Sequence, residues 1–149
     1  MASFDVQDRI AALVAILTTG LVPAQLNFVY PHQPRAITET PPVAWVEYVA
    51  GSSTNPTPFG FAGQPSTRVW SARIIAAQHL ISELDLADAA AKAAVGPMYR
   101  LIRNNPTLGG TVDHAIISAD RIAQLPVGAA GARVFHCNIF DLQVTEFMP

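Results

Sequence analysis

The stretch N-P-T-L-G-G-T-V-D, residues 105–113, decides how this 149-residue chain folds, because it joins a predicted amphipathic helix to a predicted β-strand. Pro106 ends the helix, since proline lacks an N–H group and disfavours helical geometry in the preceding residue. Gly109 and Gly110 then permit positive φ angles or a close backbone approach where the chain enters the sheet. We therefore predict a turn that needs glycine and is not a phosphate cradle. The turn residues are Asn105, Pro106, Thr107, Leu108, Gly109 and Gly110.

Helical and strand patterns extend outward from this turn. A first helix is predicted before Gly20, and its apolar residues Ile10, Leu13 and Leu17 recur at helical spacing. A second helix starts near Asp85, its N-cap, and Gly96-Pro97 predicts a kink or a restart within it. Four β-rich segments are predicted at about 42–49, 67–81, 111–119 and 132–147.

The order α-β-β-α-β-β predicts an α+β fold, with a four-stranded antiparallel sheet and two helices packed on one face. The chain is long enough for a single domain, residues 1–149, with a hydrophobic core. Long loops are expected at about 21–42 and 51–66, where prolines and glycines exclude regular structure.

Composition favours a protein that is covered by other protein. Half of the residues are hydrophobic and 13% are charged, against roughly 25% charged in ordinary soluble domains. No apolar run approaches the ~20 residues of a membrane helix, so no membrane association is expected. The N-terminus lacks a basic region, so no secretory signal is expected either. Low charge then indicates a subunit of a permanent assembly, whose interfaces are apolar. The net charge of −2 gives no electrostatic footprint for nucleic acid.

The chain carries no motif for catalysis. Sequences typical of serine nucleophiles, zinc proteases, phosphate loops and dinucleotide binding are absent. His114 and His136 could lie diagonally on one face of a final hairpin, but sheet-surface or interface histidines are the better interpretation than a metal pair. Cys137 excludes an intramolecular disulfide and is interpreted as a buried structural residue. We therefore expect no enzyme activity, no cofactor and no metal.

Four aromatic residues in the two long loops are candidates for a subunit interface: Phe28, Tyr30, Phe59 and Phe61. They can fold back over their own sheet or contact neighbouring chains, and a domain this small favours contact with neighbours. Arg68 and Arg73 lie on predicted strands. They are either solvated at a sheet edge or form salt bridges between subunits, and the sequence leaves both alternatives open.

The motif at 105–113, together with the helix before it and the order of elements, resembles the tail terminator (tail-completion) proteins of long-tailed bacteriophages. In that family a helix closes on a similar (D/N)-P-T-L-G-G-x-V-D turn before the last two strands. The resemblance implies a structural virion protein, made in the bacterial cytoplasm, that forms a hexameric ring on the head-proximal end of the tail tube. Such a ring ends polymerisation of the tube and joins the tail to the neck.

The partners that this resemblance implies are other copies of the chain in a homo-hexameric ring, the tail tube protein and a neck, stopper or connector protein. The tail sheath is a further candidate partner. DNA would pass through the lumen without sequence recognition, which a net-acidic protein permits. Two alternatives remain: a neck or stopper protein of the head–tail connector, and a small ligand-binding or enzymatic α+β domain.

Overall fold

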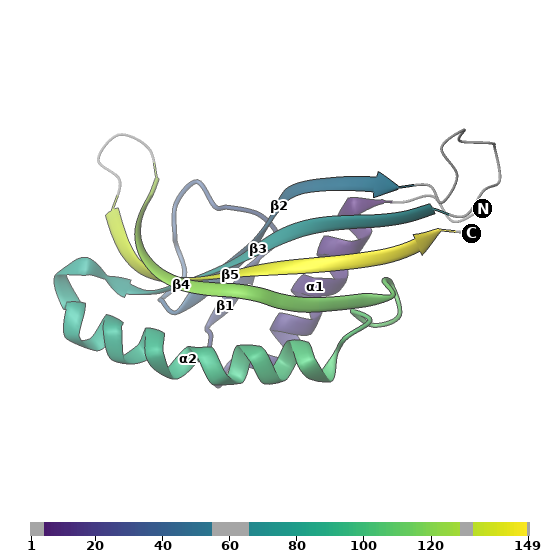
Figure 1. Cartoon of the computed structure of the whole chain (residues 1–149). Helices are drawn as coiled ribbons and strands as arrows, with labels where there is room; N and C mark the ends of the chain where they lie inside the picture. Colours follow the sequence, from purple (N-terminus) through teal and green to yellow (C-terminus); the bar gives the residue numbers. More distant parts are fainter. Residues whose placement is uncertain (1–4, 55–65, 129–132, 149) are drawn as a thin grey trace.

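The computed structural model describes residues 5–54, 66–128 and 133–148. Two α-helices, a short 3₁₀ helix and five strands follow one another along the chain (Figure 1). Their bounds are α1 Val6–Leu21, β1 Phe28–Tyr30, β2 Val43–Thr54, β3 Ser66–Leu80, the 3₁₀ helix Ile81–Glu83, α2 Leu84–Asn104, β4 His114–Val127 and β5 Arg133–Met148. The α+β class predicted from the sequence is confirmed.

The sheet has five strands in the order β1-β2-β3-β5-β4, so the predicted four-stranded antiparallel sheet is wrong. The additional strand, β1, lies in the segment 21–42 that was expected to be a loop, and it pairs with β2 in parallel. The other neighbouring strands are antiparallel. β1 has three residues, and its partner, residues 43–45, lies beyond a proline-rich segment. A strand this short has too few residues to show an alternating pattern.

β2 extends to Thr54 and β3 begins at Ser66, so both strands reach into the segment 51–66 that was predicted to be a loop. Phe59 and Phe61 lie outside the described residues.

Both helices pack on the same face of the sheet, called here the covered face (Figure 1). Asp5 caps α1, because its Oδ1 accepts a hydrogen bond from the N–H of Gln7 at 2.9 Å. Leu13 and Leu17 of α1 are fully buried, as the helical spacing predicts. They share one core with α2 and with alternate residues of the strands. Further members of this core are Met98, Ile102, Trp70, Phe140 and Leu142.

The helix α2 runs along the length of the sheet without restarting at Gly96-Pro97 (Figure 1). A helical residue before proline normally clashes through its Cβ with the proline ring, and Gly96 has no Cβ. Pro97 therefore lies inside α2 with one backbone hydrogen bond missing. The helix begins at Leu84, and Asp85 stands in its first turn instead of capping it.

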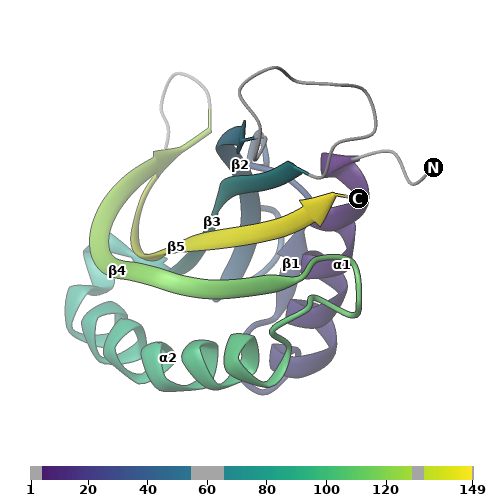
Figure 2. The same ribbon diagram turned by 45° about the vertical axis from the view of Figure 1, so that its right-hand side comes forward.

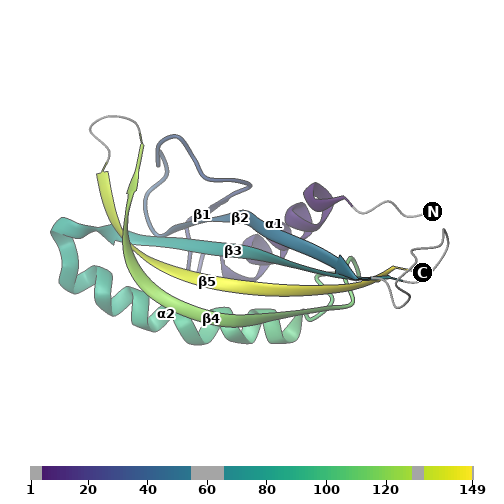
Figure 3. The same cartoon turned by 45° about the horizontal axis from the view of Figure 1, so that its top comes forward.

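The opposite, helix-free face is divided along its length. At the end near the β4–β5 hairpin, Trp45, Ile75 and Phe135 form a second apolar cluster, against which Ile37 of the segment 31–42 packs. The β4–β5 hairpin bends over this end of the sheet, as Figure 2 shows. Beyond that cluster the strands continue side by side with no helix above them (Figure 3).

Candidate assembly surfaces

The α2–β4 turn has the backbone geometry that its glycines predict. Leu108, Gly109 and Gly110 have φ angles of 47°, 72° and 86°, all in the left-handed region that favours glycine. A Cβ added to Gly109 or Gly110 would meet no atom within 4 Å. The backbone conformation, and not a lack of space, is therefore what requires glycine at these two positions.

Hydrogen bonds within the turn use several of its backbone N–H groups. The carbonyl oxygen of Thr107 accepts hydrogen bonds from Gly110, Thr111 and Val112 at 3.0, 3.0 and 3.1 Å. Leu108 is fully buried in the core of the covered face. The turn thus anchors α2 to the sheet, and these three N–H groups donate within its own chain.

Two further contacts connect this turn to both final strands. The N–H of Ala115, in β4, donates to the carbonyl oxygen of Pro106 at 2.7 Å. The N–H of Phe147, in β5, donates to Asp113 Oδ2 at 2.6 Å. The position of the turn therefore determines where β4 enters the sheet beside β5.

The structure places the described aromatic candidates at the β1 edge of the helix-free face. Phe28 and Tyr30 contact each other edge to face, with ring centroids 4.7 Å apart. Tyr30 packs against the second apolar cluster, and its hydroxyl accepts a hydrogen bond from the N–H of Glu39 at 3.3 Å. Tyr30 therefore folds over its own sheet, whereas Phe28 keeps 40% of its surface exposed.

The two arginine candidates lie on opposite faces and are not brought together. Arg68 stands opposite Glu146 in the register, and its Nη2 donates to the hydroxyl of Tyr48 at 3.2 Å on the covered face. Arg73 lies on the helix-free face, where its Nε is 3.1 Å from Asp141 Oδ1. Each arginine thus has a partner within its own chain.

A row of alternating charges crosses the helix-free face. Glu47, Arg73 and Asp141 are aligned on β2, β3 and β5. Arg121 of β4 reaches the same carboxylate, with Nη1 3.3 Å from Asp141 Oδ2. From the β2 edge to the β4 edge the signs are minus, plus, minus, plus.

Sequence reasoning missed Glu47 and Arg121 as members of this row. For Glu47 the available signal was its spacing along the strand. It is two residues beyond the buried Trp45 and therefore lies on the same face of the sheet.

Among the strands, exposed apolar side chains gather on β2, beyond its pairing with β1, and on the edge strand β4. Tyr48 and Val49 of β2 are 41% and 47% exposed, and Ile116 and Ile122 of β4 are 42% and 37% exposed. Over the described residues, the central strand β3 has no large exposed hydrophobic side chain, and β5 has Phe147 near its end. The edges of the sheet are therefore the apolar part of its surface.

The diagonal arrangement considered for His114 and His136 is not found. His114 is opposite Thr145 and His136 is opposite Gln124, so the two histidines lie far apart along the hairpin. The antiparallel register of β4 and β5, in which Val127 is opposite Arg133, sets this separation. In the described part of the chain, no group of three or more histidine, cysteine, aspartate or glutamate residues could hold a metal ion.

His136 instead lies beneath the first turns of α2. Its Nε2 is 3.5 Å from Asp88 Oδ1, and the other carboxylate oxygen of Asp88 is 2.7 Å from Lys92 Nζ. The hydrogen bond from Lys92 holds the pKa of the Asp88 carboxyl below its ordinary value, and Asp88 raises the pKa of Lys92 in turn. This cluster ties α2 to the sheet.

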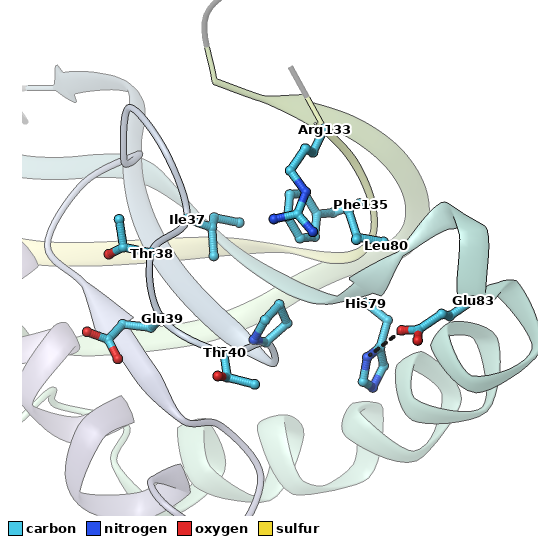
Figure 4. A pocket seen from close by; sticks show the side chains of 10 residues that line it. Ile37, Thr38, Glu39, Thr40, His79, Leu80, Glu83, Arg133 and Phe135 are labelled. Atoms are coloured by element: carbon cyan, nitrogen blue, oxygen red, sulfur yellow. Dashed lines mark ion pairs between the residues drawn. The ribbon is translucent and has the colours of Figure 1, made fainter. Parts of the chain in front are cut away.

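A cavity of about 440 Å³ opens between the segment 37–41, the end of β3 with the 3₁₀ helix, and the start of β5 (Figure 4). Its walls include His79, whose Nδ1 is 3.7 Å from Glu83 Oε2. They also include Phe135, whose ring centroid is 5.9 Å from the guanidinium carbon of Arg133. The lining mixes both signs of charge with apolar side chains, so the cavity has no clear preference for anions or cations.

Cys137 is fully buried in the second apolar cluster, and burial raises the pKa of its thiol to about 12. A thiol with this pKa is protonated at neutral pH and is not activated as a nucleophile. The interpretation of Cys137 as a buried residue is confirmed.

No protein-family model matches the chain, and no curated protein matches it. Among the described helices, none is long and apolar enough to cross a membrane.

Proposed function

We propose that the chain is a structural virion protein, a tail terminator that forms a hexameric ring on the head-proximal end of a phage tail tube. The observation that carries this proposal is the turn 105–113, whose residues resemble the family motif and whose three consecutive positive φ angles explain why that motif contains paired glycines. The turn joins α2 to the last two strands, which is the place that the resemblance implies.

The surface supports a role in assembly. Exposed apolar side chains gather on both edges of the sheet, and the chain is 13% charged, as expected of a subunit that buries much of its surface against others. A heterologous interface that is repeated with a closing rotation gives a ring and not a filament. In such a ring one face would contact the last layer of the tail tube, and the opposite face would lack the contacts that extend the tube.

The first experiment measures the oligomeric state of the purified full-length chain. Mass photometry should give a species of about 95 kDa, six copies of the 15.9 kDa chain, and negative-stain images should show sixfold rings. A protein that stays monomeric at micromolar concentration would contradict the proposal. That outcome would favour the small ligand-binding alternative, for which the cavity beside His79 is the candidate site.

A second measurement separates a terminator from a neck or stopper protein. The tail tube protein of the same phage is polymerised with increasing amounts of this chain, and tube lengths are measured by electron microscopy. A terminator shortens the tubes and appears at one of their ends. A stopper leaves the tube length unchanged and binds the portal side of the neck instead.

A further inference from the structure

In the part of the chain that the structure describes, part of β2 and at least as long a stretch of β4 have no neighbouring strand on their outer sides. β1 pairs with β2 at residues 43–45, so no described strand lies beside β2 from Val46 to Thr54 on that side. β4 is the last strand at the opposite edge, and its residues 118–122 are all exposed. Unpaired strand edges present rows of backbone donors and acceptors that another strand can satisfy.

The directions of the strands allow these two edges to meet. β2, β3, β5 and β4 alternate in direction, so β4 runs opposite to β2. If a second copy follows in the same orientation, its β2 lies antiparallel to β4 of the first copy. Antiparallel pairing of neighbouring copies therefore continues the hydrogen-bond pattern of the sheet without inverting either molecule.

The charge row also has complementary ends. On the helix-free face it begins with Glu47 at the β2 edge and ends with Arg121 at the β4 edge. When Arg121 of one copy stands beside Glu47 of the next, the signs continue to alternate across the junction. The reverse arrangements, β2 to β2 or β4 to β4, would bring equal charges together, which is unfavourable.

A β-bulge in each edge strand keeps the side chains on matching faces. In β2 the bulge lies at Val49, between Tyr48 and Ala50, and in β4 it lies at Ser118, between Ile117 and Ala119. An edge bulge discourages pairing with an unrelated strand, since every residue beyond it changes face relative to a regular partner. When the two paired strands each have a bulge at nearly the same height along the junction, the residues beyond both bulges point to matching faces again.

We propose that β4 of one subunit pairs antiparallel with the 46–54 edge of β2 in the next copy of this chain, with Arg121 opposite Glu47, so that one sheet continues around the ring. The register then places Ile116 opposite Ser52 of the neighbour, and nearly the whole free edge of β2 is used. The exposed Ile116 and Ile122 gain neighbours at this junction. This inference rests on the proposed ring.

The test is a cysteine cross-link at a neutral pair of positions. The double variant Ser52→Cys/Ile116→Cys places two thiols on directly opposed residues of the proposed pair, where Cα atoms are about 4.5–5.5 Å apart and a disulfide can form. Cys137 is fully buried and serves as a silent background thiol. The matched control is Ser52→Cys/Ala119→Cys, which moves the second thiol to another row on the same face of β4.

Circular dichroism confirms that both variants are folded, and mass photometry confirms that they form rings before oxidation. We expect the Ser52/Ile116 variant to give a ladder of covalent oligomers in non-reducing gels, with the control at least tenfold weaker. Rings without this ladder, or with equal ladders in both variants, would overturn the edge pairing and leave the ring itself intact. A wild-type chain that forms no ring overturns the proposed function, and the edge pairing falls with it.

Discussion

Two carboxylates on β5, Glu146 and Asp141, show how differently the two faces of the sheet use the same chemistry. Glu146 is on the covered face and is 5% exposed. Its Oε1 accepts hydrogen bonds from Arg9 of α1, and its Oε2 accepts one from Trp70 Nε1 at 2.9 Å. Asp141 is on the helix-free face, where its side chain and that of Arg73 are each about a third exposed.

The difference lies in what each carboxylate holds together. Glu146, near the end of β5, joins α1 to β3 through Arg9 and Trp70, so its contacts form only when the chain is folded. Asp141 joins Arg73 and Arg121 in a charge row that the sheet would keep in position even without it. Buried pairs are costly to break because a charge is left without a partner, whereas water replaces a lost partner at the surface.

The largest effect on stability is expected for Glu146→Ala, which leaves Arg9 and the Trp70 indole N–H without their carboxylate. Breaking such a buried pair should lower the free energy of unfolding by about 3 kcal/mol. Urea denaturation followed by circular dichroism measures this change. Glu146→Gln keeps an acceptor for Trp70 and serves as the matched variant, with a smaller loss. Equal stability of Glu146→Ala and wild type would show that the contact does not hold the covered face together.

A smaller loss of stability is expected for Gly110→Val. Gly110 belongs to the turn that places Leu108 in the core of the covered face. A β-branched residue at a φ of 86° should cost about 2 kcal/mol of folding stability. Gly110→Asn is the control, since asparagine tolerates the left-handed region better than other residues. Thermal unfolding should rank wild type above Asn and Asn above Val, and a valine variant as stable as the asparagine variant would refute the conformational argument.

The smallest effect is expected for Asp141→Ala, since ion pairs at this degree of exposure contribute at most about 1 kcal/mol to stability. The same urea titration measures it beside Glu146→Ala. A loss as large as that of Glu146→Ala would remove the distinction between the two faces. A small loss together with weaker ring formation would sharpen it, because the charge row would then serve contacts between chains.

The sequence predicted the parts of the fold that depend on local patterns. Leu13 and Leu17 recur at helical spacing, and both are fully buried. Gly109 and Gly110 follow a helix-ending proline, and both have positive φ angles. Burial of Cys137 in the sheet followed from the same kind of local reasoning.

Long-range pairing explains what the sequence did not predict. β1 is a strand because residues 43–45, which come later in the chain, lie beside it. No local pattern in residues 28–30 predicts this pairing. The histidines were misplaced because their separation depends on the register of a hairpin. The restart considered at Pro97 is not found, because α2 continues through this residue and Gly96 has no Cβ to clash with the proline ring. The charge row needs four strands in register before it exists.

The bulges at Val49 and Ser118 have a consequence for how this chain can change in length. Val49 is the extra residue of its bulge, so deleting it alone would leave every later residue of β2 opposite the same β3 residue and on the same face of its own sheet. In an assembly joined at these edges, a deletion in one strand would leave the neighbour's strand one residue out of phase. Gains and losses of single residues at the two bulges should therefore occur as pairs, one in each strand.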